Sequence, residues 1–157
     1  MKKHLIISII LFLSTILSTY AKDYSRQESI DIITSTLYHE ARSEGEIGIR
    51  AVASVIYNRS ERLQWKKLGL AGVCTQRKQF SCNNKGIRIP NPKGKADEKA
   101  LKICKEVAIE LVDKTFNPIH TCDHDVTIQF IKKAKSNHWC RNMKNTIIIR
   151  NHIFGEL

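Results

Sequence analysis

The amino-acid sequence predicts an α+β fold that is mainly helical, with a small antiparallel β-sheet near its C-terminus. Apolar residues recur at helical spacings in three stretches between Ser25 and Asp113. Past Pro118 they gather instead in short runs rich in Ile, Val, Thr and Phe, a pattern typical of strands. Because the helices come first and the strands last, we expect a segregated α+β domain.

Residues 1–21 have the layout of a secretory signal peptide. Two lysines form a short basic region, residues 5–17 are mostly apolar, and small residues precede a cleavage site after Ala21. The apolar stretch is shorter than the roughly 20 residues of a membrane span, although an uncleaved anchor is the alternative. We therefore expect residues 22–157 to form one exported domain, in the periplasm, the cell wall or the extracellular space.

The chain is strongly basic, with 26 Lys and Arg against 15 Asp and Glu and a net charge of +11. Residues 1–21 hold two of the lysines and no acid, so residues 22–157 keep 24 basic residues and a net charge of +9. A basic exported protein suits a polyanionic partner such as cell-wall material, anionic lipid or extracellular nucleic acid. A solvated Lys-rich surface is the alternative, and charge alone does not decide between them.

The first two helices have recognisable starts. Residues 25–28 (SRQE) form a capping box, in which the serine and glutamate satisfy each other's backbone N–H groups. The helix that follows has a core-facing stripe at Ile30, Ile33 and Leu37, and three residues further the stripe reaches Glu40. A second capping box over residues 43–46 (SEGE) predicts a turn near Arg42 and a second helix that ends near Trp65.

The remaining elements follow from breaks in the periodicity. Glycines and prolines recur through residues 66–95 and predict a long loop. Residues 96–113 predict a third helix with its apolar face inward. Short strands are predicted over residues 126–131, 146–149 and 152–154.

Five cysteines are many for a chain of this size: Cys74, Cys82, Cys104, Cys122 and Cys140. In an oxidising compartment they predict two disulfides and one free thiol. Cys104 falls on the buried face of the third helix and is expected to be free. Proximity in the sequence favours the pairs Cys74–Cys82 and Cys122–Cys140. Metal binding by these cysteines is disfavoured because no Cys-x-x-Cys pair occurs.

Glu40 is the candidate catalytic residue. Apolar surroundings disfavour the ionised form of a carboxylate, so a glutamate at the end of an apolar stripe can hold a proton and act as a general acid. The zinc-protease motif His-Glu-x-x-His is absent, because Ser43 stands four residues after His39. A capping or solvated glutamate is the alternative interpretation.

The sequence does not decide which group would act as nucleophile or base together with such an acid. Glycosidases commonly use a second carboxylate as nucleophile or base. Four acids could serve: Glu44, Glu46, Asp123 and Asp125. If none of them reaches the site, a hydroxyl group of the sugar can attack instead, with Glu40 acting first as acid and then as base.

Other residues suit substrate binding or a metal. The segment Gln79-Phe80-Ser81 offers an amide, an aromatic face and a hydroxyl to a sugar, and Trp139 is a second aromatic candidate, although a polar loop and a core tryptophan are the alternatives. A zinc site, as in an amidase, would need three converging ligands from His120, Cys122, Asp123 and His124, for which a polar turn is the simpler interpretation.

Four strings stand out in order: residues 37–59 (LYHEARSEGEIGIRAVASVIYNR), 73–82 (VCTQRKQFSC), 139–144 (WCRNMK) and 147–154 (IIIRNHIF). Together they resemble the cell-wall hydrolase family typified by the spore cortex-lytic enzymes. The first resembles its Tyr-x-Glu-Ala-Arg-Gly-Glu motif and the helix after it, and the second its Gln-Phe-Ser segment. The last two resemble its closing Trp and its Ile-Gly-x-His-x-Phe motif.

The resemblance implies a lysozyme-like fold and cleavage of peptidoglycan glycan strands between N-acetylmuramic acid (MurNAc) and N-acetylglucosamine (GlcNAc). Characterised cortex members of the family are lytic transglycosylases that leave a 1,6-anhydro end. The family's catalytic glutamate, in its Glu-Ala-Arg motif, corresponds to Glu40. The expected substrate-binding residues lie in or near these strings: Arg42, Glu44, Gln79, Phe80, Ser81, Gln129, Trp139 and His152.

Three positions depart from the family's pattern. Ser43 replaces a Gly, which the second capping box accounts for, and Arg150 replaces the Gly of the closing motif, where we expect a different turn. Gln129 stands where many members carry a His. If that His assists catalysis in those members, the activity of this chain is expected to be weaker or differently tuned.

We therefore expect residues 22–157 to be the catalytic domain of an exported, monomeric enzyme that cuts peptidoglycan glycan strands with one glutamate, without a metal or organic cofactor. Either a sugar hydroxyl or water could complete the cleavage. The positive charge would hold the enzyme on the anionic wall, and nucleic acid is not an expected partner. The alternatives are a zinc-dependent peptidoglycan amidase and a non-catalytic module that binds the wall or another polyanion.

Overall fold

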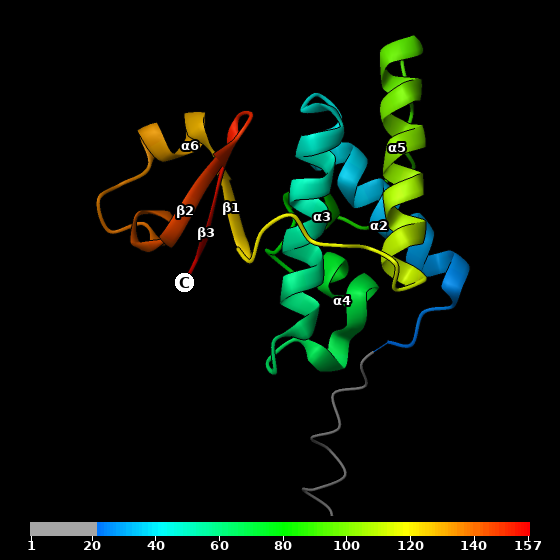
Figure 1. Cartoon of the computed structure of the whole chain (residues 1–157), viewed down its shortest axis with the longest axis horizontal. Helices are drawn as coiled ribbons and strands as arrows, with labels where there is room; N and C mark the ends of the chain where they lie inside the picture. The colour runs from blue at the N-terminus through cyan, green and yellow to red at the C-terminus, as the bar shows by residue number, and fades with distance from the viewer. Residues whose placement is uncertain (1–21) are drawn as a thin grey trace, which may run out of the picture.

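The computed structural model describes residues 22–157, so the expected signal peptide lies outside the described residues. Four helices pack together on one side of the molecule, and a small sheet with a short helix lies on the other (Figure 1). The first group, here called the helical body, contains α2 (Arg26–Ala41), α3 (Gly45–Glu61), α4 (Gly69–Thr75) and α5 (Lys95–Val112). The second group, here called the sheet unit, contains β1 (His124–Thr127), α6 (Ile128–Lys133), β2 (Lys144–Ile149) and β3 (His152–Glu156). The expected α+β class is confirmed.

The core lies within the helical body, because its helices turn their apolar residues toward one another. The residues with no exposed surface come mainly from α2, α3 and α4: Ile33, Leu37, Ile49, Val55, Ile56 and Val73. The sheet unit contributes Phe154 of β3, which is 1% exposed and packs into the same core. Burial of this apolar surface is the main term that stabilises the fold.

One of the two predicted capping boxes forms. The Ser25 hydroxyl accepts a hydrogen bond from the Glu28 backbone N–H, and the Ser25 N–H donates to the Glu28 carboxylate at 2.9 Å. The box predicted over residues 43–46 is wrong, because α3 has Glu44 as its N-cap and no side chain caps it. The carboxylate of Glu44 accepts hydrogen bonds from Asn151 instead, so it is not available to the helix start.

Three predicted boundaries need correction. The segment over residues 66–95 is not one loop but contains α4 and two 3₁₀ turns, η1 (Lys66–Leu68) and η2 (Ser81–Asn83), because Ala71, Val73 and Cys74 bury an apolar face. The second helix ends at Glu61 rather than near Trp65.

The strand predicted over residues 126–131 is also wrong beyond Thr127. The Thr127 hydroxyl accepts a hydrogen bond from the Phe130 backbone N–H at 3.2 Å and caps α6. Threonine is among the residues that favour such a helix start, and here its capping bond ends the strand. The third helix, over Lys95–Val112, agrees with the prediction to within a residue at each end.

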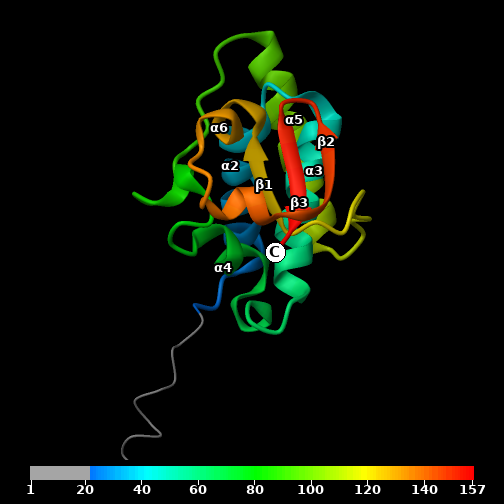
Figure 2. The same cartoon turned by 90° about the vertical axis from the view of Figure 1, so that its left-hand side faces the viewer.

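The sheet has the order β1-β3-β2 with antiparallel neighbours, as expected. Figure 2 shows it lying in front of α2, α3 and α5. In the pairing of β1 with β3, Asp125 lies opposite Phe154 and Thr127 opposite His152. Because side chains alternate along a strand, these four residues share one face of the sheet, and the buried Phe154 shows that this face is turned toward the helical body.

All five cysteines are free in the structure, so the predicted disulfides Cys74–Cys82 and Cys122–Cys140 are not present, whereas Cys104 is free as expected. Cys74 has no exposed surface, and the Cys122 thiol donates to the Asn145 carbonyl at 3.7 Å. Among residues 22–157, no helix combines the length and the apolar character that crossing a membrane requires.

Candidate functional site

Glu40 lies in the last turn of α2 and is half-buried. Its carboxylate accepts a long hydrogen bond, 3.5 Å, from the backbone N–H of Cys82 in η2. Burial is the main cause that raises the pKa of the Cys82 thiol, and the charge of Glu40 and a hydrogen bond to it add to the effect. The Cys82 sulfur therefore stays protonated, and η2 presents a neutral surface to the candidate acid.

Arg59 of α3 brings a buried positive charge to the same region. It is 4% exposed, and its Nε donates to the Asp123 backbone carbonyl at 2.6 Å. Burial lowers the pKa of Arg59, while the negative charges of Asp125, Asp123 and Glu40 oppose that shift. Arg59 thus links the helical body to the sheet unit, and its positive charge interacts with the negative charge of the candidate acid.

Asp125 and His152 form a buried pair on the inward face of the sheet, with His152 Nδ1 lying 3.1 Å from Asp125 Oδ2. The pKa of His152 is raised, first by this hydrogen bond and then by the charges of Asp125, Glu44 and Glu40, against the opposing effect of burial. His152 is therefore close enough to Glu40 for their charges to interact. The sequence marked His152 as a candidate but did not connect it with Asp125.

Glu44 connects the turn between α2 and α3 to the hairpin between β2 and β3. It is 8% exposed, and its carboxylate accepts hydrogen bonds from the backbone and side-chain N–H groups of Asn151 at 3.2 and 3.3 Å. A Cβ at Gly48 would lie 2.2 Å from Cβ of Glu44, so only glycine fits under this side chain. A cavity of about 520 Å³ beside it is lined by Ser43, Glu44, Gly45, Arg150 and Asn151.

Arg150, one of the departures from the expected pattern, occupies the β2–β3 turn in a left-handed conformation, with φ of 54°. Non-glycine residues adopt this region at a cost, which explains why glycine is the simpler residue there. The backbone conformation of this turn therefore still suits glycine, and the difference at position 150 lies in the side chain.

Two of the remaining predicted site residues are aromatic. Phe80 is buried, with the Arg59 guanidinium 5.1 Å from its ring centroid, and Trp139 is 40% exposed on the 3₁₀ turn η3 (Trp139–Asn142). The others have no described side-chain contact to Glu40, with Gln79 half-buried and three exposed: Arg42, Ser81 and Gln129. Arg42 lies over the Tyr38 ring, 5.2 Å from its centroid, and 4.0 Å from the Asp97 carboxylate.

The ligand set considered for zinc does not converge. Within residues 22–157, no group of three His, Cys, Asp or Glu side chains could hold a metal ion. His120 Nε2 contacts the Ala51 carbonyl at 3.0 Å, and its ring packs on Phe154 at 4.8 Å. His124 Nδ1 lies 2.9 Å from the Asp123 carboxylate. These contacts give both histidines structural partners, so the polar-turn interpretation is the better one.

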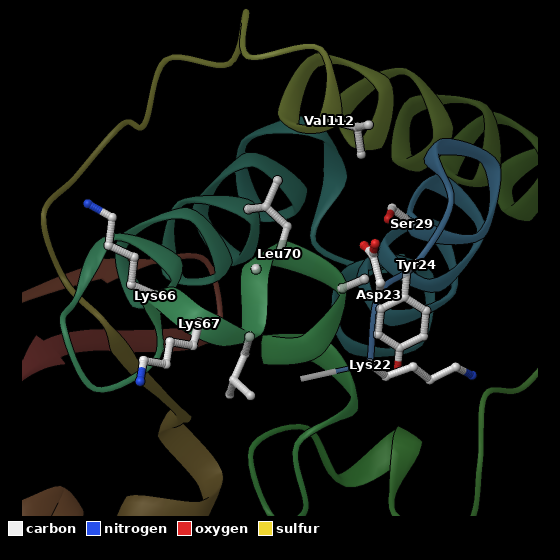
Figure 3. A pocket seen from close by; sticks show the side chains of 11 residues that line it. Lys22, Asp23, Tyr24, Ser29, Lys66, Lys67, Leu70 and Val112 are labelled. Carbon is white, nitrogen blue, oxygen red and sulfur yellow. The ribbon is translucent and has the colours of Figure 1, made fainter. Parts of the chain in front are cut away.

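A second cavity of about 520 Å³ lies at the other end of α2 (Figure 3). Lys22, Tyr24, Lys66 and Lys67 contribute to its rim. The helix rises about 1.5 Å per residue, so Ser29 in this cavity is roughly 16 Å along α2 from Glu40. This cavity is therefore separate from the site at Glu40.

Comparison with known proteins identifies the family. The model of a family described as Cell Wall Hydrolase matches residues 43–155, most of the chain. The chain belongs to the cell wall hydrolase family. The expected family and the expected class of enzyme are thereby confirmed. The matched range begins three residues after Glu40, so the role of Glu40 depends on its position in the structure.

Two solved structures share the fold. The catalytic domain of the Bacillus cereus SleB protein has 21% identity and a TM-score of 0.62, covering 86% of this chain and 94% of that domain. The catalytic domain of the germination-specific lytic transglycosylase SleB from Bacillus anthracis has 22% identity and a TM-score of 0.61, covering 86% and 98%. These likenesses confirm the expected fold. No curated protein matches the chain.

Proposed function

We propose that the chain is an exported enzyme that cuts peptidoglycan glycan strands at the β-1,4 bond between MurNAc and GlcNAc, with Glu40 as its single catalytic acid. Membership of the cell wall hydrolase family supports the substrate. The similar fold of the Bacillus anthracis protein, named as a lytic transglycosylase, supports the reaction. The position of Glu40 at the junction of helical body and sheet unit supports its role.

The observation that carries the single-glutamate mechanism is the state of the other acids. Each of the four candidates for a second carboxylate has a side-chain partner: Glu44 with Asn151, Glu46 with Arg50, Asp123 with Arg62, and Asp125 with His152. Within residues 22–157, Glu40 has no ion-pair partner, and its carboxylate accepts only from the backbone N–H and the thiol of Cys82. Of these five acids it is therefore the one without an ion-pair or amide side-chain partner, which leaves it best placed to exchange a proton with a substrate.

The reaction follows from that arrangement. The Glu40 carboxyl group donates its proton to the glycosidic oxygen as the bond from that oxygen to MurNAc C1 breaks. The 6-hydroxyl oxygen of the same MurNAc then bonds to C1, and the Glu40 carboxylate takes the proton that this hydroxyl loses. The products are a free GlcNAc hydroxyl and a 1,6-anhydro-MurNAc end. Attack by water instead would leave a reducing end.

Export and wall attachment are part of the proposal. Residues 1–21 would direct secretion, and residues 22–157 would carry a net charge of +9 to the wall as a monomer. Positive charge raises the local concentration of a protein at a polyanionic surface. Anionic wall polymers would therefore hold the enzyme near its substrate.

The variant Glu40→Gln tests the role of the acid. The amide keeps the size of the side chain but has no acidic proton to transfer, so lysis of purified peptidoglycan, followed as loss of turbidity, should fall about 10²- to 10⁴-fold. Glu46→Gln is the matched control, because Glu46 lies six residues away in an exposed ion pair with Arg50. If Glu40→Gln lyses peptidoglycan at the wild-type rate while remaining folded, the proposal is wrong.

A chelator separates the proposal from the zinc amidase. The proposed glycosidase should keep its full lytic rate in EDTA, because none of its steps uses a metal. Loss of lysis in EDTA that added Zn²⁺ restores would instead support the amidase. The measurement is the same turbidity assay, with the Glu46→Gln protein run alongside.

A further inference from the structure

Five aromatic rings form a continuous row that runs from the turn before η1 onto the sheet unit, here called the ring row. Consecutive ring centroids lie 6.3, 5.6, 5.4 and 5.1 Å apart in the order Trp65, His124, Trp139, His138 and Phe130. The residues come from four separate segments, namely the turn before η1, strand β1, the start of η3, and α6. Figure 2 shows β1 and α6 on the face of the molecule that carries this unit.

One end of the ring row is connected with the candidate site through buried side chains. The guanidinium carbon of Arg59 lies 5.8 Å from the Trp65 ring centroid and 5.1 Å from that of Phe80. Phe80 directly precedes η2, and within η2 the Cys82 N–H donates to the Glu40 carboxylate. The first ring of the row is thus connected, through the buried Arg59 and Phe80, with the segment whose Cys82 N–H contacts Glu40.

The outer part of the row is exposed to solvent instead of being buried in a core. Phe130 is 47% exposed and Trp139 is 40% exposed. An exposed cluster of large aromatic side chains on a soluble domain marks an interaction surface. His124 and His138 use Nδ1 in their hydrogen bonds, with Asp123 and Cys140, which leaves Nε2 of each ring for a ligand.

The charge around the row identifies the kind of ligand. Residues 126–155 contain six Lys and Arg and no Asp or Glu, and four of the basic residues lie between Phe130 and Arg141. Aromatic faces stack on the C–H faces of pyranose rings, and the lysines and arginines suit carboxylates. Peptidoglycan glycan offers both, because every second sugar is a MurNAc whose lactyl group ends in a carboxylate or bears a stem peptide with carboxylates of its own.

We propose that the ring row binds an extended stretch of peptidoglycan glycan beyond the bond cut at Glu40, so that the enzyme holds several sugars at once. This inference depends on the proposed function for its substrate class. Aromatic rings with basic flanks also suit single-stranded nucleic acid. Glycan is favoured here because the chain belongs to the cell wall hydrolase family.

Intrinsic fluorescence gives a direct readout, because the only two tryptophans of the chain, Trp65 and Trp139, both lie in the row. The inactive Glu40→Gln protein is titrated with glycan strands freed of stem peptides and separated by length. The tryptophan emission should change, and hexasaccharides should bind at least tenfold more tightly than disaccharides. Failure of the hexasaccharide to bind, or equal affinity for both lengths, would overturn the inference.

The second arm removes one ring. Phe130→Ala in the same background should weaken hexasaccharide binding about tenfold, the usual effect of losing an aromatic anchor. Phe130→Leu keeps the apolar volume without the aromatic face and should also bind weakly. Ile148→Ala is the control, because Ile148 is 67% exposed on β2 and belongs to no ring contact. Unchanged affinity in Phe130→Ala would contradict the inference.

The outcomes separate the two proposals. If Glu40→Gln abolishes lysis while Phe130→Ala binds hexasaccharide normally, the ring row is wrong and the proposed function stands. If Glu40→Gln lyses normally while Phe130→Ala loses glycan binding, the row stands and the catalytic role of Glu40 is wrong. Tighter binding of an oligothymidylate than of the hexasaccharide would overturn the glycan assignment.

Discussion

The helical body and the sheet unit are stabilised in different ways. The helical body is held by apolar burial, with residues such as Ile33 and Leu37 fully enclosed between helices. The sheet unit leaves Phe130, Trp139 and Ile148 substantially exposed and sends mainly Phe154 into the common core. The comparison teaches that the helices supply rigidity, while the sheet supplies side chains that face the glutamate at the end of α2.

The joint between the two units is largely polar. The Asn58 amide donates to the carbonyls of His120 and Cys122 at 2.9 and 2.8 Å, and Arg59 donates to that of Asp123. Hydrogen bonds are directional, so they fix the position of β1 more closely than apolar contact alone would. This joint determines how the Asp125–His152 pair faces Glu40. Four substitutions, described from the largest expected effect to the smallest, test whether the helical body and the sheet unit are stabilised in these different ways.

Phe154→Ala should have the largest effect, because it removes the main apolar contact between the units. The side chain is 1% exposed, and its loss should lower the free energy of unfolding by about 3–5 kcal/mol. Urea denaturation followed by circular dichroism measures it. A loss below about 1 kcal/mol would mean that the sheet unit does not pack on the core.

Asp125→Asn should lower the free energy of unfolding by an amount that depends on pH. A histidine whose pKa is raised by folding binds its proton more tightly in the folded chain, so its pairing stabilises the fold below the ordinary value of 6.5. This stabilisation disappears as the pH rises through the raised pKa of His152. The free energy of unfolding of the variant should therefore lie about 1.5–3 kcal/mol below that of the wild type near pH 6. The difference should be smaller near pH 9.

The comparison requires denaturation curves of wild type and Asp125→Asn at both pH values. The groups that face His152 are Asp125 on β1, Glu44 in the α2–α3 turn and Glu40 on α2. Glu44→Gln serves as a control, because Glu44 influences His152 through charge without bonding to it. A loss in Asp125→Asn that grows with pH would contradict the assigned pair.

Asn58→Ala should loosen the joint without disturbing the core. It leaves the His120 and Cys122 carbonyls without their donor, which should cost about 1–3 kcal/mol. Amide hydrogen exchange should speed up in β1 and β3 while α2 stays protected. Equal acceleration in α2 would show that the two units do not open separately.

Ile148→Ala should have the smallest effect, within about 0.5 kcal/mol, because this side chain is 67% exposed on β2. The measurement is the same urea titration used for Phe154→Ala. A loss comparable to that of Phe154→Ala would show that the outer face of the sheet is covered in solution.

Local signals in the sequence predicted the helical body well. The capping box at Ser25 and the apolar stripe through Leu37 depend only on neighbouring residues, so the start of α2 and the place of Glu40 followed from them. The second capping box failed because Ser43 donates to the Glu44 carboxylate and Glu46 pairs with Arg50. The Glu44 carboxylate is itself fixed by Asn151, more than a hundred residues away, which no local pattern could reveal.

The sheet side of the site was less predictable for the same reason. Asp125 and His152 were both visible in the sequence, but their pairing depends on the register between β1 and β3. The strand predicted through Ile131 failed because one hydroxyl of Thr127 starts a helix. Proximity in the sequence was also a poor guide to the cysteines, because packing against Asn145 and the core occupies Cys122 and Cys74 separately.

Product analysis by mass spectrometry tests the central claim most directly. Purified peptidoglycan is digested with the wild-type chain and with Glu40→Gln, and the soluble products are compared. The account predicts muropeptides that end in 1,6-anhydro-MurNAc from the wild type and almost none from the variant. Free stem peptides with intact glycan strands would contradict it, because they would place the cut in the peptide rather than at the glycosidic bond.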